Sequence, residues 1–153
     1  MIDKNTVAAA AQRLSSRDEA SLEMLVALRQ RALERDPALS DNVDFEPKYD
    51  SNTMGALDDI KALGRRIVKR WNKELCGMIC GNSGGYEKDR AAVLESLNIG
   101  EAAVIAAVAS ALLSLGVVAA LAAALAPLIV KRFIWPAKDE LCAAWTEAIK
   151  RSS

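Results

Sequence analysis

The sequence contains no histidine among its 153 residues. This absence removes the side chain that most often serves as a general base, as a charge switch near neutral pH and as a metal ligand. Only three cysteines are present, Cys76, Cys80 and Cys142. An odd number of cysteines is more typical of a reducing compartment than of a disulfide scaffold.

Motifs that support catalysis or nucleotide binding are also missing. Cys76 and Cys80 share one helix face, but two thiols without further ligands do not make a metal site, so we interpret them as small core residues. The glycine-rich run 81–85 lacks the Gly-Lys-Ser/Thr ending of a phosphate loop, and we expect it to end a helix. Asp58 and Asp59 are adjacent, which favours first-turn helix charges over a catalytic pair. We therefore expect no enzyme, no metal and no cofactor.

An excess of charge of one sign is absent as well. Twenty basic and twenty acidic residues cancel, so the overall charge does not indicate a nucleic-acid partner. The first residues, Met1 to Lys4, lack the basic-then-apolar order of a secretory signal. We expect a cytoplasmic protein, and the sequence leaves open whether it also associates with a membrane.

Helical periodicity is the main signal that the sequence does contain. Proline is scarce in the periodic stretches, alanine and leucine are abundant, and no run alternates with period two. This pattern predicts an all-α bundle of about six helices. We expect N-terminal helices over 1–35, an acidic loop or linker over 36–52, and a helical core over 53–153 that contains a basic amphipathic helix (53–80), a hydrophobic hairpin (102–130) and a C-terminal helix (136–151).

Three local patterns predict where helices begin. Ser16 with Glu19 matches a capping box and predicts the start of the second helix. Asn98 with Glu101 predicts a fresh start for the alanine-rich segment. Pro136 suits the first position of the last helix, because proline has no N–H to leave unpaired there.

The alanine-rich segment from Ala102 to Val130 holds 29 consecutive residues without charge, and twelve of them are alanine. Its length exceeds the roughly 20 residues of a membrane span. Basic and aromatic residues typical of a bilayer interface follow it: Lys131, Arg132, Phe133 and Trp135. However, large and small side chains gather on separate faces, as they do in closely packed helices. A single span would also conflict with the positive-inside tendency or require export of the preceding domain.

A break at Ser114, Leu115 and Gly116 predicts that this segment folds back as a helical hairpin. Each arm would be about 20 Å long, too short for a hydrocarbon core of about 30 Å. We therefore expect the hairpin to be buried at the centre of the bundle. This plan resembles that of pore-forming helical toxins, which implies conditional release of the hairpin at a membrane. The alternatives are a constitutive span over 102–130 and a hydrophobic interface in a homo-oligomer.

The predicted helix over 53–80 has one basic face, formed by Lys61, Arg65, Arg66, Lys69, Arg70 and Lys73. Such a face is typical of a helix that lies on an anionic membrane or binds an acidic protein partner. The simpler interpretation is a solvated face, or one neutralised by the acidic residues just before it. Nucleic acid is the least supported partner, because exposed aromatic residues are not interleaved with the charges.

Together these patterns predict a non-catalytic helical interaction module whose buried hydrophobic hairpin inserts into or associates with membranes. Two alternatives remain open. One is a small integral membrane protein with one span over 102–130 and a cytoplasmic helical domain. The other is a soluble adaptor for protein–protein interaction.

Overall fold

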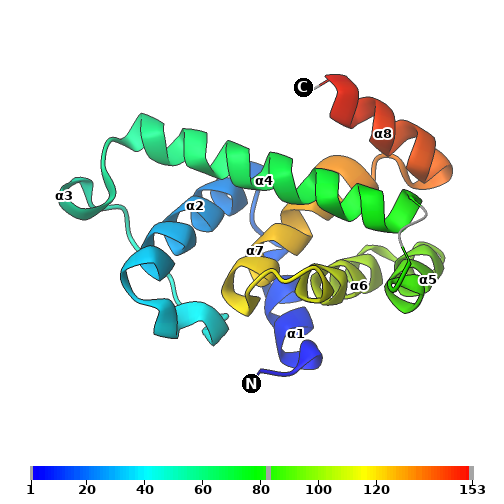
Figure 1. The fold of residues 1–153 in the computed structure, drawn as a ribbon, viewed down its shortest axis with the longest axis horizontal. Coiled ribbons are helices and arrows are strands. Elements are labelled where there is room, and N and C mark those ends of the chain that lie inside the picture. The colour runs from blue at the N-terminus through cyan, green and yellow to red at the C-terminus, as the bar shows by residue number, and fades with distance from the viewer. Residues whose placement is uncertain (1, 82–83, 152–153) are drawn as a thin grey trace.

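The computed structural model describes residues 2–81 and 84–151, and every regular element in these ranges is a helix (Figure 1). The all-α prediction is confirmed. The helices in chain order are α1 (Lys4–Leu14), α2 (Glu19–Arg35), η1 (Pro37–Asp41), α3 (Ser51–Met54), α4 (Leu57–Cys80), α5 (Glu87–Ser96), α6 (Glu101–Ser114), α7 (Ala119–Ile129), η2 (Val130–Ile134), η3 (Lys138–Glu140) and α8 (Leu141–Arg151).

These ranges hold eight α-helices, more than the six or so that the sequence predicts. One reason is that the predicted helix over 53–80 is divided: its first residues belong to the short helix α3, and the basic helix α4 begins only at Leu57. Gly55, with a φ of 88°, separates α3 from α4. The other reason is that the apolar segment contributes two helices, α6 and α7.

The start of α2 differs from the predicted capping box. The N-cap is Asp18, whose carboxylate accepts the backbone N–H of Ser21 at 2.7 Å. Ser16 lies in the preceding turn, where its hydroxyl donates to the carbonyl of Arg13 at 3.4 Å. A carboxylate at the N-cap accepts a first-turn N–H and also interacts favourably with the helix dipole.

The other two predicted helix starts are also wrong. Gly100, not Asn98, is the N-cap of α6, and its φ of 154° is a conformation that L side chains rarely adopt. Pro136 lies in a turn, and α8 begins only at Leu141. The chain bends by 76° between the helical stretches Ala119–Ile134 and Lys138–Arg151. Pro136 lies in that bend because η2 continues the preceding helix to Ile134, beyond the predicted end of the hydrophobic hairpin at 130.

Helix α7 forms the centre of the core, and all eleven of its residues are buried. It packs against α1, α2 and α6 (Figure 1). Alanine at six of the eleven positions lets neighbouring backbones approach closely, while Leu121, Leu125 and Leu128 fill the space between them. Truncating one of the fully buried leucines to alanine would cost about 2–5 kcal/mol.

The apolar segment breaks at Gly116, which has a φ of 96°. The N–H of Val117 donates to the carbonyl of Leu112, and the N–H of Gly116 donates to that of Leu113, both at 3.0 Å. This pair of bonds is a Schellman motif, which ends α6 and satisfies two of its free carbonyls. The segment is therefore not one continuous helix.

In the described residues no single helix is both long and apolar enough to cross a bilayer. By length and composition alone, the bent pair Ala119–Ile134 and Lys138–Arg151 passes the same test as a broken span.

Beyond Ile129 the helix continues as a π-helix, η2. The N–H of Trp135 donates to the carbonyl of Val130, five residues back, at 2.8 Å. Pro127 lies inside α7 and has no N–H to offer the preceding turn. A π-turn widens the helix by one residue and is frequent at functional sites. This turn carries Lys131, Arg132 and Phe133.

A buried arginine holds the acidic loop against α7. Arg29 is a charged residue, but it lies among the buried residues of α2, close to Leu25 and Val26 in the sequence. Only 1% of it is exposed. Its guanidinium donates to the carbonyls of Val43 (3.1 Å), Phe45 (3.2 Å) and Ala120 (2.8 Å). Burial lowers the pKa of Arg29 to about 10, so it stays protonated at neutral pH. This one side chain fastens α2, the loop and the start of α7 together.

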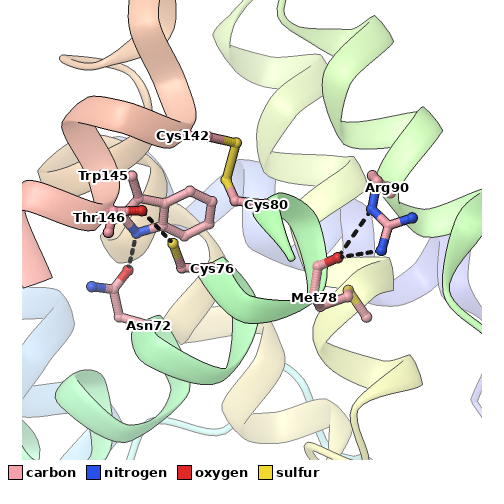
Figure 2. Close-up of a disulfide and its surroundings, with 8 residues drawn as sticks. All are labelled: Asn72, Cys76, Met78, Cys80, Arg90, Cys142, Trp145 and Thr146. Carbon is pink, nitrogen blue, oxygen red and sulfur yellow. Dashed lines mark hydrogen bonds between the residues drawn. A yellow bond between two sulfur atoms is a disulfide. The ribbon is translucent and has the colours of Figure 1, made fainter. Parts of the chain in front are cut away.

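A disulfide joins Cys80, the last residue of α4, to Cys142 near the start of α8 (Figure 2). Their Cα atoms are 5.5 Å apart, within the usual range for a disulfide. The interpretation of Cys80 as a small core thiol is therefore wrong. The odd cysteine count gave no sign of the pairing, because the two residues are 62 positions apart and meet only when α8 folds over α4.

Cys76 is the free thiol in the described residues, and it is buried as expected for a core residue. Its sulfur lies 3.9 Å from the hydroxyl of Thr146, and burial raises its pKa. Next to it, the indole N–H of Trp145 donates to the Oδ1 atom of Asn72 at 2.7 Å, with both residues buried (Figure 2). These contacts dock α8 onto α4.

Candidate functional site

Helix α4 lies along one side of the bundle, in contact with α2 and α8 (Figure 1). Close approach to α2 depends on Gly64, because a Cβ there would lie 2.8 Å from the carbonyl oxygen of Glu23. The apolar stripe of α4 faces the core. Its opposite side carries the six predicted basic residues, and all six are exposed: Lys61, Arg65, Arg66, Lys69, Arg70 and Lys73.

Within residues 2–81 and 84–151, none of these six cations forms a hydrogen bond or ion pair. Arg70 is placed over the ring of Trp71, at 4.5 Å from its centroid, and keeps its charge at the surface. The basic face is thus a row of solvated charges on one helix. We refer to these six residues as the basic face.

The acidic loop before α4 does not neutralise the basic face. Asp44 pairs instead with Arg13 at 2.6 Å, and Glu46 forms a bidentate pair with Arg17 at 2.6 and 2.9 Å. The hydrogen bond from Arg17 lowers the pKa of Glu46 below its ordinary value. These pairs fasten the loop to α1 and the α1–α2 turn.

A groove of about 630 Å³ runs beside the basic face. It is formed by four elements, α2, α4, η2 and α8, and its lining residues are Glu23, Arg65, Val68, Lys69, Asn72, Lys73, Arg132, Phe133 and Ile149. The groove brings together two sets of residues that the sequence singled out separately, three from the basic face and two from the π-turn. Its volume falls within the roughly 300–1,000 Å³ of small-molecule sites.

Arg132 supplies the ordered charge at one wall of the groove. Its guanidinium donates to Glu19 at 2.7 Å and to Glu23 at 2.9 Å. Burial alone would lower the pKa of Arg132, but the two carboxylates outweigh burial and raise it above the ordinary value. The two acids therefore compensate Arg132, while Lys69 and Lys73 across the groove have no acidic partner in the described residues.

The remaining predicted interfacial residues lie elsewhere. The Nζ atom of Lys131 donates to the carbonyl of Arg17 at 2.7 Å, so it fastens the π-turn to the α1–α2 turn. Trp135 lies under the ammonium of Lys138, at 4.2 Å from its ring centroid. The predicted turn residues Ser114 and Leu115 end α6, away from the groove.

Sequence reasoning missed four residues of the groove: Glu23, Val68, Asn72 and Ile149. Asn72 interrupts the apolar stripe of α4, and a polar residue at a core position was a usable signal. Glu23 and Ile149 belong to other helices, and only the packing of α2 and α8 beside α4 brings them to the site.

Among the described residues, no group of three or more Cys, Asp or Glu side chains is placed to hold a metal ion. A search for similar proteins finds no matching family, no matching curated protein and no matching solved structure.

Proposed function

We propose that this protein is a non-catalytic binding module that attaches to anionic membrane surfaces through the basic face of α4. The observation that supports this proposal is a row of six exposed cations on one helix of 24 residues, none of which has an acidic partner in the described part of the chain. Such a helix is about 36 Å long, so its charges can contact several lipid heads at once. Clusters of four to eight basic residues on an amphipathic helix are typical of proteins that bind anionic lipids.

The expected strength of this attachment is moderate. Each Lys or Arg near an anionic leaflet contributes about 1 kcal/mol, so six contribute at most about 6 kcal/mol. This energy is screened by salt, because the Debye length is only about 10 Å at 0.1 M. The proposal therefore describes reversible, salt-sensitive attachment.

We further propose that α6 and α7 form a central hairpin that is the hydrophobic element of a membrane-bound state. Support comes from the uncharged sequence of both helices after Glu101 and from the burial of all of α7. With 14 and 11 residues, the two helices are about 21 and 17 Å long. Both are shorter than the hydrocarbon core of about 30 Å, so insertion would be shallow.

Vesicle sedimentation tests the attachment. The wild-type protein should sediment with vesicles of phosphatidylcholine and phosphatidylserine but not with phosphatidylcholine alone. The triple variant Lys61→Glu, Arg66→Glu, Arg70→Glu should stay in the supernatant, because these three residues belong to the basic face but lie outside the groove.

A matched control keeps the same change in net charge. The variant Lys4→Glu, Arg35→Glu, Lys88→Glu reverses three exposed cations on other helices and should sediment like the wild type. Equal loss of sedimentation in both variants would show a general charge effect and refute attachment through α4. Binding to an acidic protein but to no vesicle would favour the adaptor alternative.

A further inference from the structure

The groove beside the basic face has an apolar interior and a cationic rim. Val68 at its base is buried, and Phe133 and Ile149 are half-buried on the π-turn and α8. Arg65, Lys69 and Lys73 line it from α4. Apolar walls with an excess of positive charge at the edge match a ligand that has one apolar chain and one anionic head.

The rim carries an excess of positive charge. Four cations line the groove against one carboxylate, Glu23, and that carboxylate already accepts from Arg132. The three cations of α4 are left without an acidic partner among the described residues. A phosphate monoester bears about −1.5 to −2 charges near pH 7, so it matches this excess better than a carboxylate does. Arginine also binds phosphate oxygens through two parallel N–H donors.

Asn72 places a neutral hydrogen-bond donor at the groove. It is only 2% exposed and lines the groove. The indole N–H of Trp145 is a donor only, so the amide oxygen of Asn72 must face it, and the amide nitrogen points away (Figure 2). That nitrogen donates to no partner in the described part of the chain. No fully buried side-chain nitrogen or oxygen in the described residues lacks a partner, so this nitrogen is itself accessible, and an anionic head in the groove would supply it with an acceptor.

We infer that the groove is a binding site for a single-chain anionic lipid whose head is a phosphate, with the chain on Val68, Phe133 and Ile149 and the head between Lys69, Lys73 and Asn72. This inference rests on the proposed function in that it names which membrane component the protein takes up beside its attachment surface. The spacing of the α4 residues supports it, because positions 65, 68, 69, 72 and 73 lie on one stripe of a helix.

The test is isothermal titration calorimetry of the intact, oxidised protein with lauroyl lysophosphatidate below its critical micelle concentration. One molecule per chain should bind saturably. Three comparison ligands each lack one feature. Lauroyl lysophosphatidylcholine has the chain and a phosphate but no net negative charge, laurate has the chain but no phosphate, and inorganic phosphate has no chain. Each should bind at least about tenfold more weakly. Equal binding of laurate would overturn the phosphate assignment, and equal binding of the phosphatidylcholine form would overturn the role of charge.

Two variants test the location. Ile149→Trp fills the groove from its half-buried edge, and Lys69→Glu reverses a charge at its rim, so each should weaken lysophosphatidate binding at least about tenfold. The control Ile99→Trp adds the same ring at a position that is 79% exposed in the α5–α6 turn and should bind normally. Unchanged binding in both groove variants would refute the site. The inference would also be refuted if the wild type and the control both failed to show saturable binding.

Failure of this inference is distinguishable from failure of the proposed function. The variant Lys61→Glu, Arg66→Glu, Arg70→Glu leaves the groove lining intact and should still bind monomeric lysophosphatidate. Ile149→Trp leaves all six cations in place and should still sediment with anionic vesicles. Loss of both activities in either variant would contradict the separation of the groove from the attachment residues Lys61, Arg66 and Arg70.

Discussion

Removing the disulfide between Cys80 and Cys142 is expected to weaken the attachment of α8 and to lower the overall stability. The bond closes a loop of 62 residues. The chain-entropy relation gives about 3 kcal/mol for a loop of 15 residues and about 4.7 kcal/mol for one of 100, so a loop of this length corresponds to about 4 kcal/mol. Apart from the bond, α8 is held mainly by two buried residues, Leu141 and Trp145.

Differential scanning calorimetry measures this loss. In a protein of this size, 1 kcal/mol corresponds to roughly 2–4 °C in Tm, so reduction or Cys80→Ser should lower the Tm by about 8–16 °C. The control is Cys76→Ala, which removes a buried thiol four residues away but leaves the disulfide intact. Its Tm should fall less, and reductant should still lower it further.

Counting thiols checks the bond directly. The unfolded, unreduced chain should expose one reactive thiol, that of Cys76, and the reduced chain should expose three. Three reactive thiols without reductant, or a Tm that reductant does not change, would refute the role given to this bond.

Three further predictions concern the turn, the buried arginine and the acidic loop. Gly116→Ala should cost about 1–2 kcal/mol in urea unfolding, because only the positive φ opposes a side chain there. Gly77→Ala, at an open position in the last turn of α4, should be neutral or stabilising. An equal change in the free energy of unfolding in both variants would contradict the positive-φ turn at Gly116. Arg29→Met should lower the free energy of unfolding by at least about 1–3 kcal/mol and speed proteolysis of residues 42–50, because it leaves buried carbonyls without a donor. Unchanged proteolysis would contradict the attachment of the loop through Arg29. The pKa of Glu46 is lower in the folded state than its ordinary 4.5, so its stabilising pair with Arg17 should be present above pH 4.5 and be lost as pH falls through the folded pKa. Both side chains are partly exposed, so the loss should stay below about 1 kcal/mol, and Glu46→Gln should abolish this part of the pH dependence.

Periodicity was sufficient to predict an all-helical fold, because amphipathic patterns record which face each helix buries, but it did not give the number of helices. The break at Gly116 was also readable, since glycine at the end of an apolar run is a common helix stop. Helix starts were less predictable. Asp18 and Ser16 are both good caps, and only the path of the chain after α1 decides between them.

The groove could be predicted only in part. The basic face follows from the spacing of residues along one helix. The groove also depends on how α4 packs beside the π-turn, which local spacing does not indicate. Nothing in the run after Pro127 indicated that the helix would continue to Ile134 and turn Arg132 toward α2. The pairing of Cys80 with Cys142 depends in the same way on long-range packing.

The central claim is that the cations of α4 bind an anionic surface, and its most direct test is vesicle binding as a function of ionic strength. Sedimentation of the wild-type protein with phosphatidylserine-containing vesicles should fall steeply as the salt concentration rises from about 50 to about 500 mM. No binding at low salt, or binding that salt leaves unchanged, would contradict the claim.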